Sequence, residues 1–153
     1  MEYQLRTITA SEVARLEPLY RTLVRHHNEV SAHFGGSFPS SPVEDQLREC
    51  AKDLADGKAE VAIIEEQGEP VAFCKVDVIG DSGYLDEFAV MGGHRGQGLG
   101  TQLMDWADDV FCQRCVRQIE LCLVVGNESA RRFYERRGFL PSVLEMRSAV
   151  GAR

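Results

Sequence analysis

The glycine-rich segment at residues 90–100 constrains the fold of this chain more than any other feature. An apolar strand pattern ends at Val90, five glycines follow within nine residues, and an apolar pattern with helical spacing begins at Leu99. Glycine permits a backbone with positive φ and leaves the amide groups open to a ligand. The helix that follows directs its unpaired amides and its positive dipole end at the same point. The segment therefore predicts an anion site, most often one for phosphate or pyrophosphate.

The rest of the pattern predicts an α/β fold in which a central mixed sheet carries helices on both faces. Alternating or β-branched runs predict strands at 3–8, 60–66, 71–79, 84–90 and 117–124, with one or two more in 139–148. Helical spacing and capping signals predict helices after Thr9, from Ser41 to about Asp56, from Leu99, and over 127–137. The expected order is βααβββαβαβ. A chain of 153 residues fits one domain, residues 1–153.

Composition narrows the class of partner. The chain carries 24 acidic and 17 basic residues, a formal charge of −7, which argues against nucleic acid and favours cationic small molecules. No apolar run approaches the roughly 18 residues of a membrane span, and the N-terminus does not resemble a signal peptide. We therefore expect a cytoplasmic protein without a membrane partner.

Cysteine usage agrees with that compartment. The five cysteines are an odd number, which fits a reducing environment better than a disulfide framework. Cys112 and Cys115 form the one close pair, without the second pair that a zinc site requires. We interpret them as two helix residues, one of them packed inward, and expect no metal.

Two common phosphate loops do not match residues 90–100. A Walker A loop requires lysine followed by serine or threonine after its last glycine, and neither is present in that register. A dinucleotide fingerprint requires G-x-G-x-x-G near the first strand of a βαβ unit. The spacing here is Gly96-x-Gly98-x-Gly100, and the strands before it have an antiparallel pattern.

Two segments resemble one known family. Arg95-x-x-Gly98-x-Gly100 is similar to the pyrophosphate loop of the GNAT superfamily of N-acetyltransferases, and the run from Asn127 to Phe139 resembles its N-x-x-A-x-x-[LF]-Y-x-x-x-G-F segment. The resemblance covers residues 60–139 and extends to the N-terminal helices by architecture alone. Locally, the run from Asp86 to Met91 is similar to diamine (spermidine/spermine) acetyltransferases.

The resemblance implies acetyl-CoA, or another acyl-CoA, as cofactor and acyl transfer to an amine. The pyrophosphate would lie on the loop amides, and the pantetheine would pair with the strand before the loop as an added strand does. Asn127 would contact the pantetheine or cap the last helix, and Arg131 and Arg132 would either bind the CoA phosphates or form a solvated helix face. The implied cofactor-binding residues are Phe88, Ala89, Val90, Arg95, Gly96, Gln97, Gly98, Leu99, Gly100, Asn127 and Arg131.

Direct transfer requires a base for the amine and an acid for the departing thiolate. Tyr134 matches the family's tyrosine and is our candidate acid, since a phenol stays protonated at neutral pH. Because side chains alternate faces along a strand, only one of Asp86 and Glu87 is expected to point at the acyl group. We favour Asp86 as the base, with Glu87 binding a cationic substrate. Alternatively, the pair acts only electrostatically and bulk water deprotonates the amine.

We therefore expect an N-acetyltransferase acting on a small cationic amine: a polyamine, an aminoglycoside-like compound or an amino acid. The alternatives are a protein N-terminal or lysine acetyltransferase and a non-catalytic acyl-CoA-binding or sensor domain. We interpret three histidines as ordinary surface or core residues in preference to a substrate role: His26, His27 and His33. A homodimer is a possible assembly.

Overall fold

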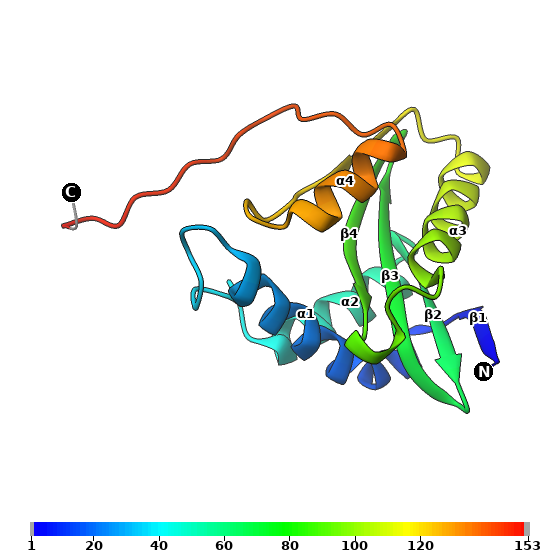
Figure 1. Cartoon of the computed structure of the whole chain (residues 1–153). Helices are drawn as coiled ribbons and strands as arrows, with labels where there is room; N and C mark the ends of the chain where they lie inside the picture. The colour runs from blue at the N-terminus through cyan, green and yellow to red at the C-terminus, as the bar shows by residue number, and fades with distance from the viewer. Residues whose placement is uncertain (1, 152–153) are drawn as a thin grey trace.

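Five strands form one mixed sheet at the centre of the molecule (Figure 1). The computed structural model describes residues 2–151. The first four strands pair antiparallel in chain order, and the fifth lies parallel to the fourth. The strands are β1 (Tyr3–Thr7), β2 (Ala59–Glu66), β3 (Glu69–Ile79), β4 (Ser82–Val90) and β5 (Gln118–Leu121). The expected fold class is confirmed.

Helices cover both faces of this sheet (Figure 1). One face carries the 3-10 helix η1 (Ala10–Leu16) with α1 (Glu17–Val30) and α2 (Val43–Ala55). The other carries α3 (Leu99–Gln113) and α4 (Glu128–Arg136). A short 3-10 helix, η2 (Gly92–His94), lies between β4 and α3.

Strand β3 separates two hydrophobic clusters because its side chains alternate between the faces. Phe73 packs with Leu16 and Leu19 on the α1–α2 side, whereas Cys74 and Val76 belong to the cluster on the α3–α4 side. Burial on both faces explains why this strand is almost continuously apolar.

The first helical region begins where the capping signal predicts, but in two parts. The Glu12 carboxylate accepts a hydrogen bond from the Thr9 amide at 3.3 Å, as in a capping box. The turns that follow are 3-10, and the α-helix begins at Glu17 with Pro18 in its first turn, where a missing N–H costs nothing. In α2, Pro42 is the N-cap rather than the first helical residue.

The strands expected in residues 139–148 are wrong. In the part of the chain that the structure describes, residues 140–149 have no regular secondary structure and extend from α4 without a partner (Figure 1). Their alternating pattern is typical of a strand, but a strand also requires a neighbour to pair with. Strand β5 is likewise shorter than expected, because the chain leaves β4 after Leu121 and the Val125 carbonyl accepts from the Ala32 amide at 2.9 Å.

The expectation that one of Cys112 and Cys115 packs inward is also wrong. Both are exposed, and Cys115 lies beyond the end of α3. Val110 and Phe111 take the inward positions instead. No helix among residues 2–151 is long and apolar enough to cross a membrane.

Candidate active site

The glycine loop has the backbone geometry of an anion site. Gly96 and Gly98 have φ of 76° and 80°, in the left-handed region, and Gly98 is the N-cap of α3. Within residues 2–151, no side chain caps this helix, and no backbone oxygen accepts from the amides of residues 96–101. A Cβ on either glycine would meet nothing within 4 Å, so it is the positive φ and not crowding that favours glycine here. The prediction of a loop of unpaired amides at a helix N-terminus is therefore confirmed in geometry.

Two side chains hold the loop against the sheet. The Tyr3 hydroxyl on β1 lies 3.1 Å from Nδ1 of His94, and Arg95 donates from Nε to the Val90 carbonyl at 3.2 Å. These contacts fix the start of the loop and leave its second half, before α3, free to face a ligand.

Strand β4 has an unpaired edge beside this loop. Pairing with β5 runs from Ser82 to Leu85 and stops there, whereas pairing with β3 continues to Val90. Along residues 86–90 the outer edge of β4 therefore has no strand neighbour in the described part of the chain. Phe88, Ala89 and Val90, expected to contact the cofactor through their backbones, all lie on this open edge.

A β-bulge places both carboxylates of β4 on the same face. The register passes from Lys75 opposite Glu87 to Val76 opposite Leu85, so Asp86 is the extra residue. Asp86 contacts Lys75, and Glu87 lies directly across the ladder from Lys75, on its face. The expectation that only one of the two could point to the acceptor side is wrong, because it assumed unbroken alternation.

Asp86 belongs to a buried ion cluster. Lys75 is 2% exposed, and its Nζ donates to Asp86 and Asp77 at 2.7 Å and to Asp53 at 3.1 Å. Burial disfavours the ammonium, but Asp86 and Asp77 outweigh it and raise the pKa of Lys75 above its usual range. Asp86 is therefore held at 2.7 Å by a buried ammonium group.

Glu87 has different surroundings. Burial, and then the charge of Asp86, raise the pKa of Glu87 to about 8, with Lys75 acting in the opposite direction. Its carboxyl group has no hydrogen-bond or ion-pair partner in the chain from residue 2 to residue 151. Of the two adjacent carboxyl groups, Glu87 is the one with a free proton-accepting position and a pKa near neutrality.

Tyr134 approaches β4 from the opposite face. It is 9% exposed on α4, and its ring lies against Phe88, Phe133 and Phe139 at centroid distances of 5.4–6.2 Å. Burial raises the pKa of its phenol, which keeps the proton on the oxygen at neutral pH. In the described chain the Tyr134 hydroxyl has no hydrogen-bond partner. Every fully buried side-chain oxygen in this part of the chain has a partner, so the Tyr134 hydroxyl must be accessible to solvent.

The remaining predicted contacts lie at the start of α4. Asn127 caps the helix, since its Oδ1 accepts from the Ala130 amide at 3.3 Å, as one of its two expected roles required. Arg131 is exposed and pairs with Glu135 at 2.7 Å. His26, which the sequence analysis interpreted as an ordinary surface or core residue, lies on α1; burial, the largest effect, lowers the pKa of its imidazole.

The sequence analysis missed the cluster of carboxyl groups around Lys75. The available signal was a lysine inside the apolar run of 71–79, since lysine is almost never fully buried without a charged partner. Asp53 could not have been assigned as that partner, because it lies on α2 and reaches Lys75 only in the folded chain.

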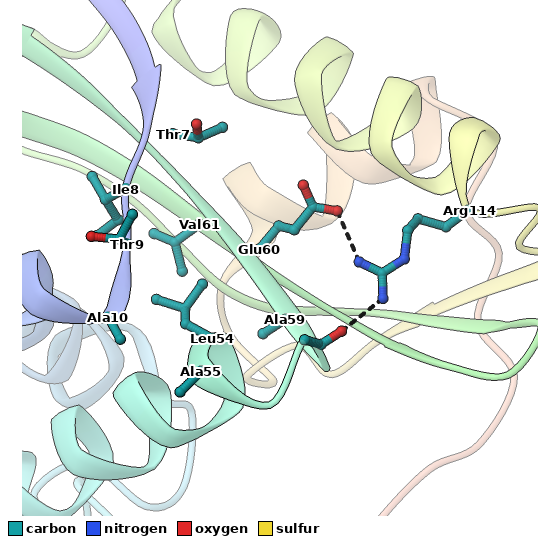
Figure 2. Close-up of a pocket in the computed structure, with 11 residues that line it drawn as sticks. Thr7, Ile8, Thr9, Ala10, Leu54, Ala55, Ala59, Glu60, Val61 and Arg114 are labelled. Atoms are coloured by element: carbon teal, nitrogen blue, oxygen red, sulfur yellow. Dashed lines mark hydrogen bonds and ion pairs between the residues drawn. The ribbon is translucent and has the colours of Figure 1, made fainter.

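A separate hollow lies at the opposite end of the sheet (Figure 2). Arg114 reaches across it to Glu60 at 3.0 Å and to the Gly57 carbonyl at 2.8 Å, so its charged group is already satisfied. The start of β2, which lines this hollow, pairs with the end of β3, and the end of β3 pairs with the start of β4. The hollow therefore lies at the end of the sheet away from the glycine loop. The candidate active site is therefore the open end of β4 and not this hollow.

Comparison with known proteins agrees with the loop and helix motifs. The family model described as "Acetyltransferase (GNAT) family" matches residues 19–139. N-alpha-acetyltransferase 30 of Schizosaccharomyces pombe is 37% identical over 82 residues, 52% of this chain and 55% of that protein. A putative [ribosomal protein bS18]-alanine N-acetyltransferase of Bacillus subtilis is 26% identical over 88 residues, 58% of each chain. The chain thus spans somewhat over half the length of these curated relatives.

Solved structures share the fold. PaiA N-acetyltransferase from Thermoplasma acidophilum, in complex with coenzyme A, superposes with a TM-score of 0.77 at 12% identity, over 95% of this chain and 94% of that one. The more specific similarity to diamine acetyltransferases is not confirmed by these relatives, whose names indicate other acceptors.

Proposed function

Because the chain belongs to the GNAT family of acetyltransferases, whose model matches most of its length, we propose that it transfers an acetyl group from acetyl-CoA directly to a primary amine. One observation carries this proposal. The open edge of β4 ends in the glycine loop, has the free carboxyl group of Glu87 on one face, and has the free phenol of Tyr134 against the other.

The residues present fit acetyl-CoA, which would supply an activated thioester carbonyl and a thiolate leaving group. The unpaired amides of residues 96–101 suit the pyrophosphate, and the outer edge of residues 86–90 suits the amide groups of the pantetheine. Arg132, exposed on α4, is available to phosphate groups, whereas Arg131 would first have to leave its exposed pair with Glu135. In this proposal Asn127 contributes by fixing the start of α4.

Glu87 is the proposed base, in place of Asp86. An alkylammonium with a pKa of about 10 must lose a proton before its nitrogen can attack. Glu87 has a pKa of about 8 and no partner, so its carboxylate is free to accept that proton, whereas an oxygen of Asp86 is engaged at 2.7 Å by a buried ammonium. Asp86 then acts on Glu87 through its charge, which helps to raise the pKa of Glu87.

Tyr134 is the proposed acid. Its protonated hydroxyl lies on the α4 side of β4, opposite the carboxyl groups, and the rings of Phe88 and Phe139 fix its ring. A phenol held in this position donates its proton to the leaving sulfur and regains one from solvent after product release. Base and acid thus act from opposite faces of the same strand.

For the acceptor we propose a small cationic amine: a polyamine, an aminoglycoside or an amino acid. Four carboxyl groups, those of Asp53, Asp77, Asp86 and Glu87, surround a single buried cation on the α1–α2 side. The chain as a whole carries a charge of −7. Both features favour a positively charged molecule at this face.

A peptide or protein α-amino group is the second candidate acceptor. The two curated relatives support it, since one is named an N-alpha-acetyltransferase and the other a putative ribosomal-protein-alanine N-acetyltransferase.

Steady-state consumption of acetyl-CoA tests the function. The acceptor panel contains a polyamine, an aminoglycoside, free amino acids, peptides with a free N-terminus and N-terminally blocked peptides with lysine. Turnover with the small amines supports the first acceptor class, and turnover with free N-terminal peptides alone replaces it with the second. Binding of acetyl-CoA without turnover on any amine would contradict catalysis and favour a non-catalytic acyl-CoA sensor.

A further inference from the structure

His94 connects the glycine loop to the β1 edge of the sheet. It is the last residue of η2, two positions before Gly96, and its side chain is 21% exposed. Its Nδ1 atom lies 3.1 Å from the Tyr3 hydroxyl and 3.5 Å from a carboxylate oxygen of Glu66, the last residue of β2. Among residues 2–151, no other carboxyl group forms an ion pair with His94. One ring nitrogen therefore faces two different partners.

The two partners are neighbours in the sheet. Tyr3 and Glu66 lie directly opposite each other in the β1–β2 ladder, so their side chains share a face. Partial burial, and then the charge of Glu66, raise the pKa of Tyr3, which keeps the hydroxyl proton in place at neutral pH. The Tyr3 ring also meets the His94 ring edge-on, with the ring centroids 5.9 Å apart. The sheet thus offers a hydrogen-bond donor and a charged acceptor to the same nitrogen.

The charge of the imidazole decides which partner it binds. A neutral ring without a hydrogen on Nδ1 accepts a hydrogen bond there from the Tyr3 hydroxyl. A protonated ring carries a hydrogen on Nδ1, and the Glu66 carboxylate is then the stronger acceptor, because both groups are charged. Histidine is the side chain that ordinarily changes its charge between about pH 5 and about pH 8. The two arrangements therefore exchange within the physiological range.

The position of His94 carries its charge to the anion site. Its amide donates to the Met91 carbonyl at 2.9 Å, and the Met91 amide donates to the Val71 carbonyl at 2.9 Å, so η2 is anchored to β3. The side chains of His94 and Arg95 are the last to be tied to the sheet before the unpaired amides of residues 96–101. A positive charge on His94 adds to the attraction that a helix N-terminus exerts on phosphate groups.

We propose that His94 is a positioning residue of the cofactor site and that its protonation strengthens the binding of coenzyme A, with Glu66 holding the protonated ring and Tyr3 the neutral one. This inference rests on the proposed function, because it takes the glycine loop as the pyrophosphate site. Binding linkage is reciprocal, so a cofactor that prefers the protonated ring must in turn favour protonation of His94.

Calorimetric titration with coenzyme A at about pH 5.5 and about pH 8 tests the inference. The gain in affinity on acidification should be at least about threefold larger in the wild type than in His94→Gln. Other groups that ionise near this interval are His26, Glu87 and the phosphates of the cofactor, and they are common to all variants. His33→Gln, at an exposed histidine in the loop after α1, is the matched control and should behave as the wild type.

Two further variants separate protonation from a purely structural contact. Glu66→Gln removes the charged partner of the protonated ring, so it should reduce the gain in affinity on acidification. Tyr3→Phe removes the donor to the neutral ring, so it should weaken binding mainly at high pH and enlarge that gain. A contact that only supports the loop would lower affinity without changing the gain in opposite directions. Circular dichroism checks that each variant is folded.

The ring resonances of His94 in NMR spectra give a readout without activity. Protonation of His94 should occur at a higher pH with coenzyme A bound than without it. An equal gain on acidification in the wild type and His94→Gln, or a His94 titration that the cofactor does not move, would overturn the inference and leave the proposed function standing. A wild type that binds no coenzyme A at any pH would contradict the proposed function, and this inference with it.

Discussion

Adjacent carboxyl groups on β4 differ in what they can do. Asp86 is bound to Lys75 at 2.7 Å, whereas Glu87 has no partner in the described chain and a pKa raised to about 8. The two residues are adjacent in the sequence, and their side chains share a face because of one β-bulge. At the scale of the residue, the surroundings of each group decide its chemistry more than its type does.

Replacing Glu87 tests the base. As pH rises through about 8, Glu87 loses its proton and becomes able to accept one, so kcat/KM of the wild type should rise over that interval. Glu87→Gln should lower kcat about 100-fold and remove this rise. The ionisation of the amine is common to all variants. Asp86→Asn is the matched control and should keep the rise at a lower pH, because the charge of Asp86 no longer raises the pKa of Glu87. Loss of the rise in that variant alone would make Asp86 the base.

Replacing Tyr134 tests the acid. Tyr134→Phe keeps the ring in its aromatic cluster and removes only the hydroxyl, so it should lower kcat at least about tenfold. The dissociation constant for coenzyme A, measured by calorimetry, should change less than about twofold, because the hydroxyl acts in the transition state. Phe133→Leu is the control for disturbed packing. An unchanged kcat in Tyr134→Phe would remove the acid from the mechanism.

At the scale of elements, the glycine loop connects β4 to α3 with a backbone that requires glycine at two positions. Gly96 and Gly98 adopt φ values that other residues rarely reach, and this backbone turns consecutive amides outward at the helix N-terminus. The β-bulge within β4 is a second local feature of this kind. It places Asp86 in contact with Lys75, while Phe88 remains in contact with Tyr134 on the other face.

Gly98→Ala tests the loop. At φ of 80° an alanine is strained, so the unfolding free energy should fall by about 1 kcal/mol. The affinity for coenzyme A should also fall, because the strain shifts the amides that face the pyrophosphate. Gly57→Ala, at φ of 72° in the turn after α2, is a matched control and should lose similar stability without losing affinity. Equal affinity losses in the two variants would contradict a binding role for the loop.

Lys75→Met tests the buried cluster that connects α2, β3 and β4. The change leaves three carboxylates near one another without a counterion, so the unfolding free energy near neutral pH should fall by about 3 kcal/mol. The loss should shrink on acidification, since burial raises the pKa of Asp77 to about 6 and a protonated carboxyl needs no cation. Lys52→Met, which breaks an exposed pair with Asp56, should cost less than about 1 kcal/mol. Equal losses in urea titrations would refute the argument.

At the scale of the whole molecule, the sheet divides the protein into two functional sides. Helices α3 and α4 cover one face and α1 and α2 the other (Figure 1). Tyr134 lies on the α3–α4 side, and the carboxyl groups around Lys75 lie on the α1–α2 side. In the proposed function, the cofactor and the acceptor would reach the open end of β4 from opposite directions. The contact between Ala32 and Val125 joins the two sides beside this opening.

A ligand that binds the folded molecule should stabilise it as a whole. At about 100 times its dissociation constant, coenzyme A should add about 2.7 kcal/mol and raise Tm by several degrees. ATP and NAD should have much smaller effects at equal concentration, because the loop lacks their binding patterns. Differential scanning fluorimetry measures all three shifts. A larger shift with ATP than with coenzyme A would contradict the assignment of the loop.

Much of the fold could be predicted because its signals are local. The glycine loop, the cap at Thr9 and the turn at Gln67 and Gly68 depend on residues adjacent in the chain. The hidden partner of Lys75 could not be predicted, because Asp53 lies 22 residues away on another element. The roles proposed for the candidate site residues could not be predicted, because they depend on burial and on neighbouring charges.

The sequence by itself determined the family, the order of all but the last element, and the glycine loop with its helix. The family follows from the resemblance of two motifs, and the element order and the loop follow from backbone preferences and from periodicity within single segments. Only the tertiary structure decided that Asp86 and Glu87 share a face, because the bulge exists only in the pairing of β4 with β3. It likewise decided that residues 140–149 stay unpaired, because the strand pattern in a segment cannot specify whether a partner edge lies within reach.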